Sequence, residues 1–183
     1  RDNSTVVVPR GRGSTALSAL LQFFWSKVVG GANVLRCLAA LHEAVAIYRE
    51  RFQPSEQLKA PHVMIGCNVV VADTEDEARK LFTSPQQQFT RMVRGTRGQL
   101  PPPVEDIEDF WSPQEKAQAS SMLACSFYGS PTTIGGKLAP LIEETGADEL
   151  MVAAAIWDHS ARVRSFELLA DAMGQEQRVR KAG

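Results

Sequence analysis

The spacing of apolar and polar residues in the last third of the chain predicts a helix, a glycine stop and a strand. Ser130 can cap a helix whose first residue is Pro131, because a proline at that position needs no backbone N–H. Apolar residues then recur at helical spacing at Ile134, Leu138, Leu141 and Ile142. Gly146 suits the left-handed residue that ends such a helix. Residues 149–156 are apolar at every position from Leu150 on, which is typical of a parallel strand covered on both faces.

The middle of the chain predicts a second strand followed by a helix. Residues 62–72 end in three consecutive valines, and β-branched residues favour strands. Residues 74–77 form a capping box, with Thr at the cap and Glu three positions later. The helix that starts there is expected to restart or kink at Pro85 and to continue to residue 93. An earlier helical stripe over residues 38–52 stops before a proline.

A helical excursion separates the two strand–helix units. Residues 94–104 combine glycines with three consecutive prolines and predict a loop. A second capping box at residues 112–115 predicts a helix that runs to about Leu123. We expect the excursion, about residues 84–128, to cover the active rim of an α/β fold. Its aromatic pair Phe110 and Trp111, together with Trp157 further on, is expected in the core.

The two units together predict an α/β fold with a functional site where the strands end. Three parts of the chain are distinguished: residues 1–36, which show no clean periodicity, residues 37–175, and a basic tail over 176–183. Within the first part, residues 6–8 are a candidate for a short strand. Arg10 and Arg12 before an apolar stretch faintly resemble a secretory signal, but no clear cleavage site follows.

Composition excludes several classes of partner. The 183 residues are 44% hydrophobic, enough for a core, and 20 basic against 21 acidic residues leave a net charge of −1. Such a balance favours neither nucleic acid nor an anionic membrane surface. No apolar run approaches the roughly 20 residues that a membrane helix needs. The three cysteines, Cys37, Cys67 and Cys125, have no metal-site spacing and indicate buried thiols in a reducing compartment, the cytoplasm.

Four groups of short motifs carry a resemblance to a known family. They are residues 48–58 (Tyr-Arg-Glu-Arg-Phe-Gln-Pro-Ser-Glu-Gln-Leu); residues 69–74 with Glu77-Ala78; Gly129-Ser130-Pro131 with residues 145–152; and Asp158-His159 with Ala161-Arg162 and Arg164-Ser165. Their order and spacing over about residues 41–173 resemble the bacterial luciferase-like family of flavin-dependent monooxygenases. Residues 1–36 are not matched.

The resemblance implies a (β/α)8 TIM-type barrel that binds reduced flavin mononucleotide, or a deazaflavin in some members, at its carboxyl rim. It implies oxygenation of an organic small molecule by O₂, with a flavin reductase as supplier of the cofactor. Residues 37–175 would be the C-terminal portion of that barrel, incomplete and truncated, since most flavin contacts of the family come from earlier strands. An incomplete sheet has open edges, so we expect a homo- or hetero-oligomer. The alternative is a catalytically inactive fragment or a non-catalytic partner subunit packing on another barrel.

Five residues are candidates for the site. Asp158 and His159 follow a predicted buried strand, so they can hydrogen-bond substrate or flavin, and His159 can move a proton near neutral pH. The alternative is that Asp158 simply caps the next helix. Arg162, in the first turn of that helix, and Arg94 and Arg97, in the excursion loop, are candidates for binding the flavin phosphate or an anionic substrate. The alternative for these arginines is a solvated surface. No metal site is expected.

Overall fold

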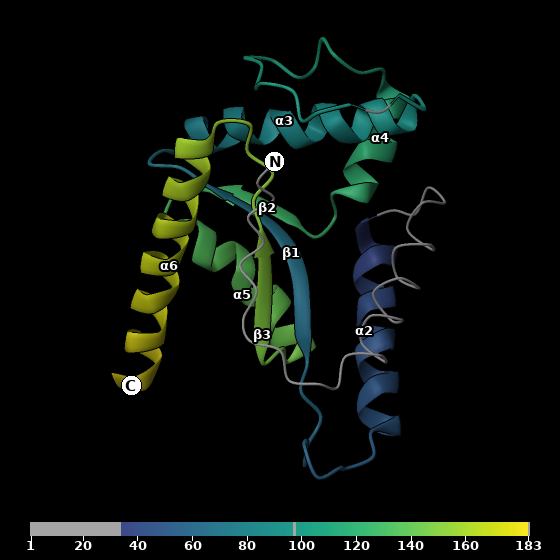
Figure 1. Cartoon of the computed structure of the whole chain (residues 1–183), viewed down its shortest axis with the longest axis vertical. Helices are drawn as coiled ribbons and strands as arrows, with labels where there is room; N and C mark the ends of the chain where they lie inside the picture. The colour runs from purple at the N-terminus through teal and green to yellow at the C-terminus, as the bar shows by residue number, and fades with distance from the viewer. Residues whose placement is uncertain (1–33, 97, 183) are drawn as a thin grey trace.

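A computed structural model of the chain describes residues 34–96 and 98–182. Its elements, in chain order, are α2 (Val34–Arg51), β1 (Met64–Val71), α3 (Glu75–Val93), α4 (Pro113–Met122), β2 (Ser126–Gly129), α5 (Ile134–Thr145), β3 (Glu149–Ala153) and α6 (His159–Ala182). Figure 1 shows α3 lying across the end at which the strands finish. The predictions for residues 1–33 and for Arg97 lie outside the described residues.

The three strands form one parallel sheet in the order β2-β1-β3. The first half of β1 pairs with β3, from Met64 opposite Glu149 to Asn68 opposite Ala153. The second half pairs with β2 on the other side, from Asn68 opposite Ser126 to Val71 opposite Gly129. The sequence predictions of an α/β fold, of a strand within residues 62–72 and of a parallel strand within 149–156 are therefore confirmed, and these two strands are direct neighbours. Each connection between parallel strands passes through helices, as parallel pairing requires.

The main core lies on one face of β1. Alternate residues of the strand, Ile65, Cys67, Val69 and Val71, are buried against apolar side chains of α5 and α6. From α5 come Ile134, Leu138 and Leu141, and from α6 come Leu168, Leu169 and Ala172. A smaller core forms on the other face near the carboxyl end of the sheet, where Val70 packs with Phe82, Leu123 and Ile156. Burial of these apolar surfaces is the dominant stabilising contribution to the fold.

The prediction that residues 84–128 form one helical excursion is wrong at its carboxyl end, where residues 126–128 belong to strand β2. Its four residues, Ser126–Gly129, are too few for a recognisable period, and three of them are only partly buried. The helix before it also differs from expectation, since α3 runs unbroken from Glu75 to Val93 with Pro85 inside it. Pro85 is itself buried, so packing holds the helix through the position where one backbone hydrogen bond is missing.

Helix α5 begins three residues later than the sequence predicts. It starts at Ile134, and Ser130 does not cap it with its side chain. Instead the Ser130 carbonyl accepts the N–H groups of Thr133 at 3.1 Å and Ile134 at 3.0 Å, so residues 130–133 form a turn. The two glycines after Ile134 therefore lie in the first helical turn, where their low helix propensity matters less than in the interior.

Strand β3 is not covered on both faces, contrary to the prediction. Its residues alternate between exposed and partly buried, and the side chain of Met151 is 45% exposed. Among the described residues β3 pairs with β1 alone, and the helices α5 and α6 pack on one face of the sheet. Trp157, expected in the core, is 55% exposed, whereas the neighbouring Ile156 is fully buried and Trp111 is buried as expected.

Gly146 provides a test of the packing between α2 and α5. It ends α5 with φ +57°, as predicted, and its carbonyl accepts a hydrogen bond of 2.6 Å from Nη2 of Arg49 in α2. A Cβ at this position would lie 2.9 Å from the same nitrogen. We expect Gly146→Ala to lower the free energy of unfolding by roughly 1–2 kcal/mol, because alanine is strained in the left-handed region.

The matched control is Gly136→Ala in the same helix, where an added Cβ meets nothing within 4 Å. We expect it to raise the free energy of unfolding slightly, by less than about 0.5 kcal/mol, because alanine is the better helix former but the position lies in the first helical turn. Urea unfolding followed by circular dichroism measures both values. Changes of the same sign in the two variants would contradict this account of Gly146.

Candidate functional site at the carboxyl ends of the strands

The carboxyl ends of β1 and β2 lie side by side, because Val71 and Gly129 are partners in the parallel register. Asp73 and Glu75 follow the first strand, and Ser130 follows the second. Helix α6 joins the same region, since the buried hydroxyl of Ser165 accepts the N–H of Val71 at 2.8 Å. In open and closed parallel sheets, ligands bind at this end. We call this region the rim.

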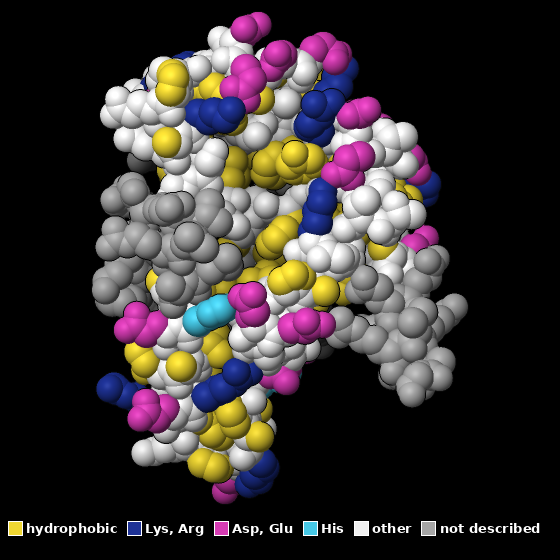
Figure 2. All heavy atoms as spheres, turned by 180° about the vertical axis from the view of Figure 1, so that it is seen from behind, with side chains coloured by type: hydrophobic (Ala, Val, Ile, Leu, Met, Phe, Trp, Pro, Cys, Tyr) yellow, Lys and Arg dark blue, Asp and Glu magenta, His cyan; other side chains and the backbone are white. Residues whose placement is uncertain are grey.

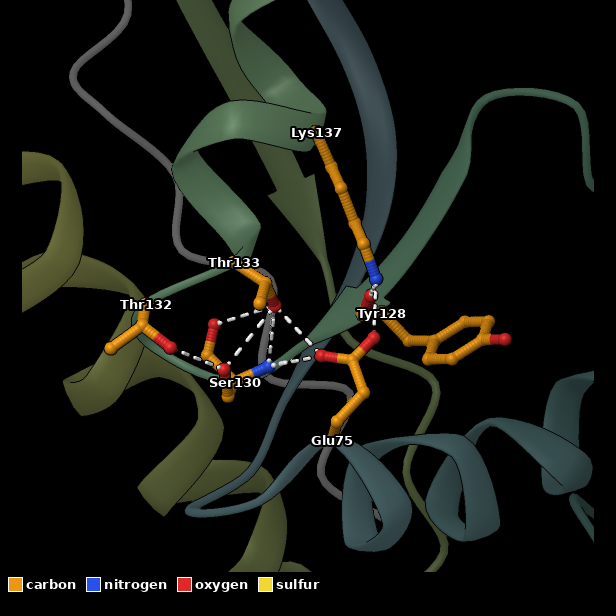
Figure 3. Close-up of polar contacts among 6 residues, drawn as sticks. All are labelled: Glu75, Tyr128, Ser130, Thr132, Thr133 and Lys137. Carbon is orange, nitrogen blue, oxygen red and sulfur yellow. Dashed lines mark hydrogen bonds and ion pairs between the residues drawn. The ribbon is translucent and has the colours of Figure 1, made fainter.

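A network around Glu75 occupies the rim (Figure 3). Glu75 lies in the first turn of α3, and its Oε2 accepts hydrogen bonds from the backbone N–H of Ser130 at 3.1 Å and from Oγ1 of Thr133 at 2.7 Å. Its Oε1 accepts from Nζ of Lys137 at 2.5 Å. Lys137 also donates to the carbonyl of Tyr128 at 2.7 Å. One carboxylate thus joins the start of α3 to the turn after β2 and to the first turns of α5.

The electrostatics of this Glu75 network favour the ionised carboxylate. The hydrogen bond from Lys137, then those from Thr133 and from the N–H of Ser130, lower the pKa of Glu75 from 4.5 to about 2. Gly129 leaves the room that the network needs, because a Cβ there would lie 2.6 Å from Oγ1 of Thr133 and 3.3 Å from Oε2 of Glu75. The donors at this turn therefore already hold an anion that belongs to the protein.

The Glu75 network was missed by the sequence analysis. The sequence analysis interpreted residues 74–77 only as a capping box, and Thr74 does cap α3 by accepting the N–H of Glu77 at 3.2 Å. The Gly-Ser-Pro motif was a visible signal for a turn at 129–131. Nothing in the sequence connects that turn to a carboxylate 55 residues earlier.

The lowered pKa of Glu75 predicts a specific dependence of stability on pH. The contribution of its ionised form is fully present above about pH 4.5 and is lost as the pH falls towards about 2. We therefore expect Glu75→Gln to be less stable than the wild type at neutral pH and the difference to shrink over that interval. Thermal unfolding from pH 7 to 2 measures it. The control is Glu77→Gln, an exposed residue in the same turn. A wild-type advantage over Glu75→Gln that persists unchanged at the lowest pH would contradict the prediction.

The structure places Asp158, His159 and Arg162 together at the start of α6. Oδ1 of Asp158 accepts the N–H of Ala161 at 2.8 Å, so the helix-capping alternative describes what this side chain does here. Nη2 of Arg162 lies 2.8 Å from Nδ1 of His159. Because a guanidinium only donates, Nδ1 accepts, and in this arrangement the imidazole carries its proton on Nε2. Asp158 and His159 are exposed and Arg162 is partly buried.

Arg94 is engaged in a clamp at the far end of α3. Its Nε donates to Oε1 of Glu115 at 2.7 Å, and its Nη2 donates to the carbonyl of Phe110 at 2.6 Å. The guanidinium also lies 4.8 Å from the centre of the Phe110 ring. The hydrogen bond from Arg94 is the main cause that lowers the pKa of Glu115 to about 2. The clamp joins α3 to the amino end of α4.

If Arg94 forms a stabilising clamp, its loss should lower the stability of the fold, whereas the loss of a solvated loop arginine should not. We expect Arg94→Ala to lower the urea midpoint of unfolding, because Glu115 and the Phe110 carbonyl lose their charged donor. Arg91→Ala, one turn earlier on the same helix, serves as the control and should change the midpoint little. Equal midpoints for the two variants would show that the clamp contributes nothing measurable to stability.

A cavity of about 460 Å³ lies between α3 and residues 105–108, beside Tyr128. Acidic residues dominate its charged lining, with Asp76, Glu77, Glu105, Asp106 and Glu108 against Arg79 and Lys80. Figure 2 shows acidic side chains over the upper part of the molecule and hydrophobic side chains in the hollow below them. Among the described residues, no group of His, Cys, Asp and Glu could hold a metal ion. No helix in this part of the chain is long and apolar enough to span a membrane.

Comparisons with known proteins place the chain in a family. No family model matches it. It is 42% identical over 131 residues to a protein of Escherichia coli K12 named luciferase-like monooxygenase, which is 72% of this chain and 39% of that protein. It is 43% identical over 128 residues to the uncharacterized protein YvbT of Bacillus subtilis, covering 70% of this chain and 38% of YvbT.

Among solved structures, the crystal structure of apo-MsnO8 matches 73% of this chain and 41% of its own length, with a TM-score of 0.65 and 29% identity. The chain thus spans about two fifths of the length of the relatives it matches. The sequence resemblance and the matching fold agree over the same share of the chain. We conclude that this chain belongs to the luciferase-like monooxygenase family.

Proposed function

We propose that this chain contributes the rim, at the carboxyl ends of β1 and β2 and the start of α6, to the site of a flavin-dependent monooxygenase. The observation that supports the proposal most strongly is the 42% identity to a luciferase-like monooxygenase over 131 residues, 72% of this chain. Reduced flavin mononucleotide would supply the chemistry of O₂ activation when it is bound, whereas a deazaflavin, the alternative cofactor, would supply hydride transfer instead. The substrate is an organic small molecule, and a separate flavin reductase supplies the reduced cofactor. We assign the activity to the cytoplasm, where thiols such as Cys67 stay reduced.

The described residues alone do not enclose a phosphorylated flavin. The donors of Ser130, Thr133 and Lys137 are taken by Glu75, and the cavity beside α3 has an acidic lining that disfavours a phosphate. The face of the sheet at Met151 is open. We infer that these residues form one wall of a site, and that further parts of a longer chain, as long as the relatives are, complete it.

Within that wall we propose different roles for the residues at the start of α6. Arg162 is the cofactor-binding residue, because it lies in the first turn of α6 and, among the described residues, its guanidinium contacts the imidazole of His159 and no carboxylate. His159 presents Nε2–H as a donor, and Asp158 positions both by capping the helix. Arg94 binds an anion only if it leaves Glu115, and Arg97 remains a candidate from sequence alone.

A second candidate function is that of a non-catalytic partner that packs on another barrel. Two observations support it: among the described residues the outer edge of β3 has no partner strand, and the apolar side chains of Met151, Trp157 and Val163 are exposed. Exposed strand edges and apolar patches are places where further strands or subunits bind. On this view the chain associates through β3 and contributes no residue to flavin binding.

The two functions are distinguished by an anaerobic titration with reduced flavin mononucleotide. It is carried out on the whole chain and on a chimera in which the matched 131-residue segment of the E. coli relative is replaced by that of this chain. We expect the chimera to bind flavin and Arg162→Ala in it to weaken binding roughly tenfold, the effect of one charged hydrogen bond. The control is Arg79→Ala, whose exposed guanidinium pairs with Asp76 on α3.

Each outcome has a stated meaning. Weak binding by the whole chain with binding by the chimera supports the proposal of a shared site. A folded chimera that does not bind flavin would favour the non-catalytic partner. Equal affinities of the Arg162 and Arg79 variants would remove Arg162 from the site while leaving the family function intact.

A further inference from the structure

Cys67 and Cys125 lie next to each other at the point where β1 and β2 begin to pair. The register of that pair starts at Asn68 opposite Ser126, and each cysteine is the residue immediately before. The N–H of Asn68 donates to the carbonyl of Cys125 at 3.0 Å, so the ladder already includes the backbone of Cys125. Neighbouring strands lie about 4.8 Å apart, which is within the Cα–Cα range of about 4.4–6.8 Å that a disulfide needs.

The two side chains also belong to the same face of the sheet. Cys67 lies in the main core with Val69, two residues further along β1. Phe127, two residues after Cys125 and opposite Val69, packs against that same core. Because side chains alternate along a strand, Cys67 and Cys125 share this face. The two groups interact electrostatically, and neither forms a disulfide in the structure.

We propose that Cys67 and Cys125 form a redox pair that a peroxide converts to a disulfide between β1 and β2. The peroxide oxidises the sulfur of Cys125 to a sulfenic acid and leaves as water. The sulfur of Cys67 then attacks the sulfenic sulfur, an S–S bond forms, and a second water leaves with the Cys67 proton. In total the two thiols lose two electrons and two protons, and the peroxide is reduced to two waters.

The surroundings of the two thiols set the order of these steps. Cys67 is only 5% exposed, and burial is the first cause that raises its pKa to about 12, so it stays a thiol at neutral pH. Cys125 is partly exposed and therefore meets the oxidant first. Cys67 acts as the resolving thiol, because the strand pairing holds it beside Cys125. Since its raised pKa keeps it protonated, it transfers its proton to the leaving hydroxide of the sulfenic acid as it attacks, and this makes the resolving step the slower one.

The disulfide would tie the whole α3–α4 excursion to the sheet. Asn68 and Ser126, the residues that follow the two cysteines, are 58 positions apart. The closed loop contains both α3 and α4 and therefore the Arg94 clamp that joins them. Cross-links that close long loops restrict the unfolded chain and stabilise the folded state. Oxidation would thus make this half of the rim more resistant to unfolding.

The test uses the full wild-type chain and hydrogen peroxide. After oxidation the remaining thiols are blocked with N-ethylmaleimide and the protein is digested with trypsin. The three cysteines fall in separate peptides, 37–49, 60–79 and 117–137, so mass spectrometry identifies the pairing directly. We expect peptides 60–79 and 117–137 to be linked, with a mass two hydrogens below their sum, and to separate on treatment with dithiothreitol.

Two variants and one further measurement complete the test. Cys37→Ser should retain the link and Cys67→Ser should lose it. Oxidised wild-type protein should unfold at a higher urea concentration than reduced protein, and Cys67→Ser should show no such shift. Linkage of Cys125 to Cys37 or to a second copy would overturn the proposal. Oxidation of Cys125 beyond the sulfenic acid without any link to Cys67 would also overturn it.

Discussion

The backbone pairing of β1 is the constraint on which the rest of this structure depends. The strand gives its first half to β3 and its second half to β2, and Asn68 has a partner on both sides. The side chain of Asn68 adds a hydrogen bond of 3.1 Å to the hydroxyl of Ser126. Because both neighbours are parallel to β1, all three strands run in the same direction, and their carboxyl ends lie at the same edge of the sheet. The rim, the Glu75 network and the packing of α6 through Ser165 follow from that common direction.

The parts of the fold that sequence predicts well are those whose signals are local. The valine run of β1 and the two capping boxes each act within a few residues, and both capping residues, Thr74 and Ser112, do cap their helices. Gly146 is in the left-handed conformation that its position suggested. Strand β2 is different, because its four residues are too few to show a period, and they form a strand only through pairing with β1.

The candidate site shows the same division between local and long-range determinants. Ser130 and Pro131 have the residue types of a cap and a first helical turn, yet a carboxylate from α3 takes the N–H of Ser130 and α5 begins later. The positive charge of Arg94 in a loop suggested that it binds an anionic ligand, yet its partner is the carboxylate of Glu115. In both cases the partner is distant in sequence. Charge and hydrogen-bonding capacity could be predicted, but the group that satisfies them could not.

Strand β3 shows a mismatch of another kind. Its sequence is apolar on both faces, but the described residues cover only one, and Met151 remains exposed. An apolar residue on an open sheet face is suited to a further layer or strand, which accords with relatives of more than twice the matched length.

The Glu75 network then limits where an anionic cofactor can bind in such an assembly. Its donors already hold a carboxylate whose ionisation they favour, so a phosphate would have to displace it and leave Glu75 with a negative charge nearby. At the start of α6 the carboxylate of Asp158 caps the helix, but among the described residues no carboxylate pairs with Arg162, whose side chain contacts the imidazole of His159. For the proposed function, electrostatics therefore favour Arg162 over the Gly-Ser-Pro turn as the group that binds the phosphate of a flavin.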